Sequence, residues 1–169
     1  VYTGVSAVSH ATMASCAGYP KRLLERASTI HNAILDWPET GLKREEARAS
    51  FGFPEGRVVL AAIGRHVAQK NYALLVEIAR KLDPKFLIAI AGEGPLRGQF
   101  EASAAAAGVG DRFAVLGALG RERVADLLVA SDVYIMPSLF EGNSNSLLEA
   151  LTSGRPIIAH DIPEQREVL

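Results

Sequence analysis

The sequence predicts an α/β fold in which a doubly wound parallel sheet carries helices on both faces. From Arg57 onward, short apolar runs alternate with amphipathic stretches, which is the pattern of a parallel sheet wrapped by helices. The runs are apolar at nearly every position, as expected of strands that are covered on both faces. The chain has 169 residues, of which 49% are hydrophobic, so it is long enough to bury a core of its own.

Five strands are expected in this alternating part, and right-handed crossovers between them produce the doubly wound arrangement. The expected strands are Val58–Ile63, Phe86–Ala91, Phe113–Leu116, Val133–Met136 and Pro156–Ala159. Helices are expected between them, because large apolar residues recur at helical spacing over 74–82, 124–128 and 147–151. A further predicted helix over 100–107 is alanine-rich and ends at Gly108, a common helix stop.

The part before Arg57 follows a different pattern. Its predicted elements are strands over Gly4–Ser9 and Ser28–Ile34, a short helix over Ala11–Cys16 and a solvated helix over Lys43–Ser50. The chain begins at Val1 without an initiator methionine and stops at Leu169, in what is predicted to be a newly begun helix. We therefore expect a fragment of a longer protein.

Charge and cysteine content argue against several function classes. The net charge is -1 and the pI is near 6.5, and no basic cluster is interleaved with aromatic residues, so nucleic acid is not an expected partner. Cys16 is the only cysteine, which excludes an internal disulfide and favours a reducing, cytoplasmic setting. The four histidines are too scattered in the sequence to suggest a metal site. No apolar run approaches the length of a membrane span.

The segment after Val133–Met136 joins two carboxylates to a run of small polar residues. Glu141 lies on the predicted loop, and Glu149 lies in the helix that follows. Open α/β sheets bind ligands beyond the carboxyl ends of their strands, and the free N–H groups of a new helix favour phosphate. We expect a charged, phosphorylated small molecule here. The spacing Ser146-x-x-Glu149 also fits a capping box, in which Glu149 would be structural.

Two other strand ends carry candidate ligand groups. Gly64, Arg65 and Lys70 follow the first strand, where the cations either bind phosphate or are solvated surface charges. His66 between them is interpreted as a bystander. Gly92 and Gly94 follow the second strand with the wrong spacing for the dinucleotide fingerprint G-x-G-x-x-G. They form either a tight turn, with Pro95 in the first turn of a helix, or a backbone contact with a nucleotide.

The three loops are more informative together than singly, because the carboxyl ends of parallel strands meet at one edge of the sheet. Two cations beside the amides of helix starts suit a diphosphate, and a carboxylate can accept hydrogen bonds from paired sugar hydroxyls. This combination describes a nucleotide sugar.

The loops also belong to a longer series of short motifs. In chain order these are Val8-Ser9, Ile30-His31-Asn32-Ala33, Gly64-Arg65 followed by Lys70, Gly92-Glu93-Gly94-Pro95-Leu96, Leu116-Gly117, Ser131-Asp132-Val133, Pro137-Ser138, and Glu141 to Glu149-Ala150. Each is ordinary alone. Their order and spacing, nearly end to end, strongly resemble those of the nucleotide-binding half of retaining GT-B glycosyltransferases, the group called glycosyltransferase family 4 or group 1.

The resemblance implies a Rossmann-like donor-binding domain over residues 32–169, truncated at its C-terminus, with residues 1–31 left from an acceptor-binding domain. It implies transfer of a sugar, with retained configuration, from a UDP-, GDP- or ADP-sugar to a glycan or lipid-linked acceptor. No cofactor or metal is obligatory in such enzymes. Polysaccharide biosynthesis is a matching role, and the location would be cytoplasmic or peripheral at the cytoplasmic membrane face.

The resemblance also implies residue roles. Arg65 and Lys70 would bind the diphosphate and Glu141 would contact the sugar, which makes these three the expected catalytic residues, while Glu149 would hold the ribose. The other implied donor-binding residues are Gly64, Gly92, Gly94, Gly142, Asn143, Ser144 and Leu148.

Two departures from the family pattern bear on turn geometry. The family usually has Asn-Gly where this chain has Asn32-Ala33, and Lys-Gly where it has Lys70-Asn71. Alanine tolerates positive φ worse than glycine does, whereas asparagine tolerates it fairly well. Two other functions stay open. One is a GT-B sugar-nucleotide epimerase or phosphorylase, and the other is a nucleotide-diphosphate-binding domain without catalysis, since a fragment without its acceptor domain is expected to be inactive.

Overall fold

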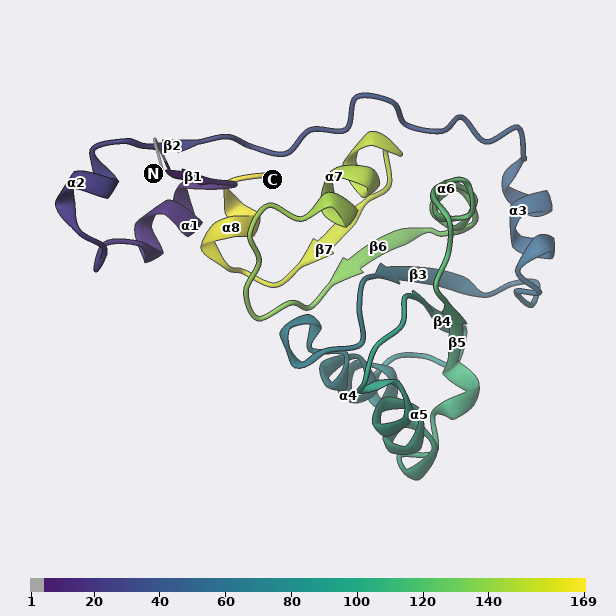
Figure 1. Ribbon diagram of the computed structural model, residues 1–169. Coiled ribbons are helices and arrows are strands. Elements are labelled where there is room, and N and C mark those ends of the chain that lie inside the picture. Colours follow the sequence, from purple (N-terminus) through teal and green to yellow (C-terminus); the bar gives the residue numbers. More distant parts are fainter. Residues whose placement is uncertain (1–4) are drawn as a thin grey trace.

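The structure is a computed structural model that describes residues 5–169 (Figure 1). Its main sheet has five parallel strands in the order β5-β4-β3-β6-β7. The strands are β3 (Val58–Ile63), β4 (Phe86–Ala91), β5 (Phe113–Gly117), β6 (Val133–Met136) and β7 (Ile157–Ala159). The expected doubly wound α/β fold is confirmed, and no strand bound differs from its prediction by more than one residue.

Helices cover both faces of this sheet, as Figure 1 shows. The helices on one face are α4 (Ala73–Lys81) and α5 (Arg97–Ala106), and those on the other are α3 (Arg44–Ser50), α6 (Arg121–Ala130) and α7 (Asn145–Thr152). Because successive strand residues point to opposite faces, Leu60 and Ala62 of β3 pack with α4 and α5, whereas Val59 and Ala61 pack with α3 and α6. Two 3-10 turns, Ala68–Lys70 and Gly110–Arg112, were not predicted.

The strand order reverses between β3 and β6. The connections from β3 to β4 and from β4 to β5 run through α4 and α5 on one face, and the chain then returns through α6 on the other face to place β6 beside β3. Ligands of open α/β sheets bind at the carboxyl ends of strands beside such a switch point. The loops after β3 and β6, which carry Lys70 and Glu141, lie on its two sides.

A separate two-stranded parallel sheet forms near the start of the chain. Its strands are β1 (Val5–Ala7) and β2 (Ala27–Thr29), accompanied by α1 (His10–Ser15) and α2 (Lys21–Leu24). The predicted strand over 28–34 is too long, because pairing with β1 ends after the bond from Ile30 N–H to Ala7 O. Gly4, the predicted start of the first strand, lies outside the described residues.

The first and last segments of the described chain meet. The C-terminal helix α8 (Pro163–Arg166) packs against α1, and Figure 1 shows both beside β1. Helix α1 begins one residue earlier than predicted, because the Ser9 hydroxyl accepts a hydrogen bond from Thr12 N–H at 3.0 Å and caps it. Within residues 5–169, no helix combines the length and apolar character that crossing a membrane requires.

At the amino end of the main sheet, Asp132 joins three elements. Its carboxylate accepts hydrogen bonds from Val59 N–H at 2.7 Å, from Arg48 at 2.5 Å and from Arg44. Burial by itself would raise the pKa of Asp132, but the Val59 N–H and the two arginines outweigh it and hold the pKa below its usual range. Asp132 therefore ties α3 to the starts of β3 and β6.

Candidate ligand-binding site

Glycines let the ends of β3, β4 and β5 approach one another closely. A Cβ atom at Gly92 would lie 1.9 Å from the Gly64 carbonyl oxygen, and the Gly92 N–H donates to Gly117 O at 2.7 Å. Gly92 also has φ 142°, a conformation that side chains disfavour. No residue other than glycine fits there, so the three strand ends form one compact floor.

Gly94 has a similar role one loop further. A Cβ atom at Gly94 would lie 2.6 Å from His66 O, and the loops are joined by bonds from His66 N–H to Glu93 O and from Leu96 N–H to His66 O. The prediction that Pro95 stands in the first turn of a helix is wrong. Helix α5 begins at Arg97, with Pro95 in the turn before it, because this lacing to the β3 loop holds the preceding backbone outside the helix.

Lys70 and Glu141 meet across the switch point. Lys70 Nζ lies 2.6 Å from Glu141 Oε1, and only 14% and 8% of the two side chains are exposed. The lysine stem runs over Gly64, where a Cβ atom would lie 2.7 Å from Lys70 Cε. Gln69 supports the pair, since its Nε2 donates to Phe140 O at 2.9 Å and approaches Glu141 Oε2 at 3.4 Å. The structure thus joins two of the three predicted catalytic side chains in a mostly buried ion pair.

Arg65 and His66, which are neighbours in sequence, have opposite environments. Arg65 is exposed, and within residues 5–169 its guanidinium has no hydrogen-bond or ion-pair partner. His66 is 1% exposed and its ring packs edge-on against Tyr72 and Phe100. Burial lowers the pKa of His66, and Arg97 lowers it further. Arg65 is available to a ligand, and His66 is a core residue.

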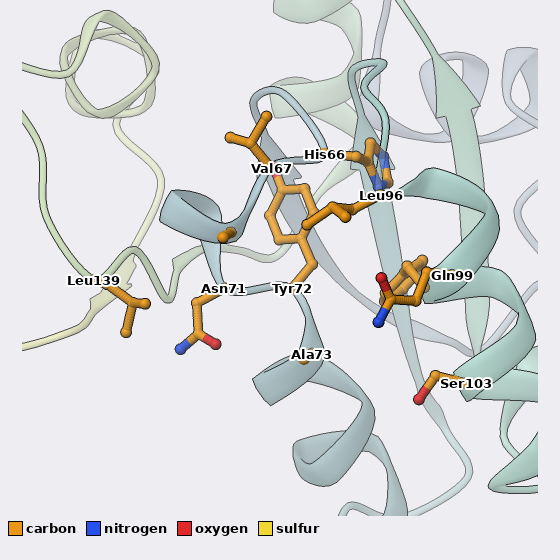
Figure 2. A pocket seen from close by; sticks show the side chains of 11 residues that line it. His66, Val67, Asn71, Tyr72, Ala73, Leu96, Gln99, Ser103 and Leu139 are labelled. Carbon is orange, nitrogen blue, oxygen red and sulfur yellow. The ribbon is translucent and has the colours of Figure 1, made fainter.

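A cavity of about 360 Å³ lies between the β3 loop and α5, on the face of the sheet that carries α4 (Figure 2). Figure 2 shows Tyr72, Leu96 and Leu139 around it, with Gln99 and Ser103 on the α5 side. Its lining is mainly apolar and includes none of the predicted site residues. The cavity is therefore distinct from the charged edge beside the switch point.

Glu149 is not part of a capping box. Helix α7 begins at Asn145 with Ser144 as its N-cap, so Ser146 lies inside the helix, where its hydroxyl accepts a hydrogen bond from Tyr134 at 2.9 Å. Glu149 is half-buried, and among the described residues its carboxylate has no hydrogen-bond partner. Burial raises the pKa of Glu149, and Arg121 partly opposes the rise. Leu148 beside it is partly buried.

The loop between Glu141 and α7 is supported by the start of the chain. Asn32 Nδ2 donates to Asn143 O at 2.8 Å and to Asn145 Oδ1 at 3.0 Å. A Cβ atom at Gly142 would lie 2.9 Å from Val8 Cγ2, so the early segment presses directly on the loop. Asn143 and Ser144 are buried, and the Asn143 side-chain oxygen has no partner within the described part.

Sequence reasoning missed the supporting roles of Asn32 and Gln69. Asn32 was noticed only as part of a motif, and nothing local indicates a partner that is 111 residues away. The two departures from the family pattern are accommodated differently. Asn71 adopts the left-handed conformation, with φ 51°, and it is the one non-glycine residue with positive φ within 5–169, so Ala33 avoids that conformation.

The sequence over residues 43–169 matches the family "Glycosyl transferases group 1". The 2-deoxystreptamine N-acetyl-D-glucosaminyltransferase of Streptomyces fradiae is 33% identical over 130 residues, which cover 74% of this chain and 31% of that protein. The putative glycosyltransferase EpsF of Bacillus subtilis is 34% identical over 142 residues, which cover 81% and 36%. The chain thus spans about a third of the length of these relatives.

Solved glycosyltransferase structures share the fold. Anabaena HepE in complex with UDP and glucose superposes with a TM-score of 0.84 at 18% identity, over 99% of this chain and 46% of that one. WaaG, a glycosyltransferase involved in lipopolysaccharide biosynthesis, has a TM-score of 0.78 at 24% identity, over 91% and 43%. The five-stranded parallel sheet is accordingly that of GT-B glycosyltransferase structures.

Proposed function

This chain belongs to the glycosyl transferases group 1 family, and we propose that its charged edge binds the nucleoside diphosphate sugar that the whole protein uses as a glycosyl donor. One observation carries the proposal. At the switch point between β3 and β6, Arg65 and Glu149 have no protein partner within residues 5–169, while Lys70 and Glu141 stand between them as a preformed pair.

The diphosphate is assigned to the cations. Arg65 offers a free, permanently charged fork that can donate two parallel hydrogen bonds to phosphate oxygens. Lys70 has donors beyond the one that Glu141 accepts, since an ammonium carries three N–H bonds. The N–H groups of Gly142, Asn143 and Ser144 precede α7, where a helix start favours negative charge.

The sugar and ribose are assigned to the carboxylates. Glu141 is held by Lys70 through Oε1, which leaves acceptor capacity for sugar hydroxyls. Glu149 can accept hydrogen bonds from the paired ribose hydroxyls in the same way. When the bond from sugar to diphosphate breaks, Arg65, Lys70 and the loop amides stabilise the charge that grows on the leaving group. Transfer with retained configuration, the outcome that the resemblance implies, forms part of the proposal.

UDP is the first nucleotide to test. HepE has been solved with UDP-glucose, and the pneumococcal O-GlcNAc transferase GtfA with UDP and GlcNAc. We assign the acceptor, a glycan or glycolipid, to the part of the protein beyond this chain, with residues 1–31 as the link to it. The isolated chain is then expected to bind donor without turning it over, in a protein that works in the cytoplasm or at the cytoplasmic membrane face.

Isothermal titration of the chain with UDP, GDP and ADP, followed by their sugar conjugates, tests the proposal. Saturable binding of one nucleotide that is lost in Arg65→Ala supports it and identifies the donor class. Gln99→Ala, on the wall of the apolar cavity, is the matched control and should bind as the wild type does. Binding that Arg65→Ala leaves intact but Gln99→Ala abolishes would place the nucleotide in the cavity and overturn the proposal.

A further inference from the structure

Three potential metal ligands from distant parts of the chain lie together where its two ends meet. His10 begins α1, His31 follows β2 and Glu167 follows α8. One ligand atom of each lies within 4.8 Å of the other two, and His31 Nε2 is 2.7 Å from Glu167 Oε1. The sequence places these residues too far apart to suggest a site, and the contact of α1 with α8 assembles it.

Neighbouring groups already orient two of the three side chains. Glu167 Oε1 accepts a hydrogen bond from His10 N–H at 2.8 Å, and Oε2 accepts one from Ala11 N–H at 3.1 Å. His10 Nδ1 lies 3.3 Å from Thr29 Oγ1, so a ring that donates from Nδ1 keeps its Nε2 lone pair free. Metal-binding histidines usually donate their second ring N–H in this way, to a group that fixes the tautomer and the ring orientation.

The donor set selects the kind of ion. Two imidazoles and one carboxylate suit Zn²⁺ and similar transition metals, whereas Mg²⁺ prefers all-oxygen sites that retain several waters. In tetrahedral zinc sites with bonds of about 2.0 to 2.1 Å, ligand atoms stand roughly 3.3 Å apart. The 2.7 Å contact of His31 with Glu167 would widen slightly as an ion replaced the proton between them. Exposure of His10 and His31 leaves water the fourth position.

We propose that His10, His31 and Glu167 form a Zn²⁺ site that clamps the first segment of the chain to α8. Its consequence reaches the charged edge, because His31 adjoins Asn32, which holds the loop after Glu141. The proposal stands independently of the nucleotide sugar, since none of the three ligands belongs to the proposed donor site.

Calorimetric titration of the 169-residue chain with ZnCl₂, beside MgCl₂, tests the proposal. We expect one equivalent of Zn²⁺ to bind, no comparable Mg²⁺ binding, and a melting temperature that rises with Zn²⁺ concentration. His10→Ala and Glu167→Gln should each lower the Zn²⁺ affinity at least tenfold. Thr29→Val should lower it about 10- to 100-fold, the usual effect of removing a group that orients a ligand.

Two controls separate this site from incidental zinc binding. Glu164→Gln changes another carboxylate on α8, and Cys16→Ser removes the free thiol near α1, so both variants should bind as the wild type does. Thr29→Val keeps the test valid if Glu167→Gln loosens α1. The proposal is overturned if no saturable binding occurs, if binding survives both His10→Ala and Thr29→Val, or if Cys16→Ser abolishes it.

Discussion

The two ends of the main sheet use charged residues in opposite ways. At the amino end, both oxygens of Asp132 are engaged, by Val59 N–H and by two arginines that belong to α3. At the carboxyl end, Arg65 and Glu149 lack protein partners among residues 5–169. Charges whose bonds are all made contribute to the folded state, whereas charges left open are available to a ligand.

Lys70 and Glu141 stand between these two cases. Their ion pair is mostly buried, like that of Asp132, yet it lies at the switch point where ligands bind. Such a pair has both roles, because removing one partner leaves an uncompensated charge in the interior. Stability and binding should therefore separate cleanly at Asp132 and Arg65 but not at Lys70.

The largest expected effect is on stability at the amino end. Asp132→Ala leaves Arg48 and Val59 N–H without their partner, and we expect the free energy of unfolding to fall by about 3 kcal/mol. Urea denaturation measures the loss. Nucleotide affinity of the variant that remains folded should match the wild type, and a large drop in affinity would contradict the division between the two ends.

The second prediction concerns the cations at the carboxyl end. Arg65→Ala and Lys70→Ala should each weaken UDP binding by about 1.5 to 3 kcal/mol, the range for a charged hydrogen bond. Only Lys70→Ala should also destabilise the fold, because it strands Glu141. Calorimetry and thermal unfolding on both variants check this. The double variant Lys70→Met with Glu141→Gln should recover stability without recovering affinity, and equal melting temperatures for the two single variants would count against the buried pair.

The third prediction is pH-dependent. Burial raises the pKa of Glu149 in the folded state, so its contribution to stability is present below the unfolded pKa and is lost as pH rises through the folded pKa. Glu149→Gln should therefore match the wild type in melting temperature at pH 4 and equal or exceed it at pH 7. UDP affinity should fall by about 1 kcal/mol. A lower melting temperature at pH 7 with unchanged affinity would make Glu149 a structural residue.

The smallest expected effect lies at Asn32, which touches the site only through Asn143 and Asn145. Asn32→Ala should weaken UDP binding by about 0.5 kcal/mol, since the loop after Glu141 loses a neutral hydrogen-bond donor. Calorimetry beside Ser28→Ala, a change on neighbouring β2, provides the comparison. Equal affinities for the two variants would show that the loop holds its shape without Asn32.

Local patterns were enough to predict the main sheet. Val58–Ile63 and Phe86–Ala91 are short, continuous apolar runs between turn residues, and they became strands with those bounds. The strand predicted over 28–34 was too long because its residues run past the end of β1, and strand length there depends on the partner. Whether a partner exists is a property of the fold.

The site was predictable by residue but not by contact. Motif order along the chain indicated Arg65, Lys70, Glu141 and Glu149, and the topology placed their loops beside one switch point. Nothing in the sequence showed that Lys70 and Glu141, 71 residues apart, form a pair, or that Tyr134 engages Ser146 inside α7. These contacts depend on the register of neighbouring elements, which local patterns do not encode.

Thermal unfolding with increasing UDP, run on the wild type, Asp132→Ala and Arg65→Ala, tests the division of labour between the two ends most directly. We predict that UDP raises the melting temperatures of the wild type and of Asp132→Ala by similar amounts, because both keep the site. Arg65→Ala should start at the wild-type melting temperature and show no rise. A UDP-dependent rise in Arg65→Ala as large as in the wild type, or none in any of the three, would contradict the account.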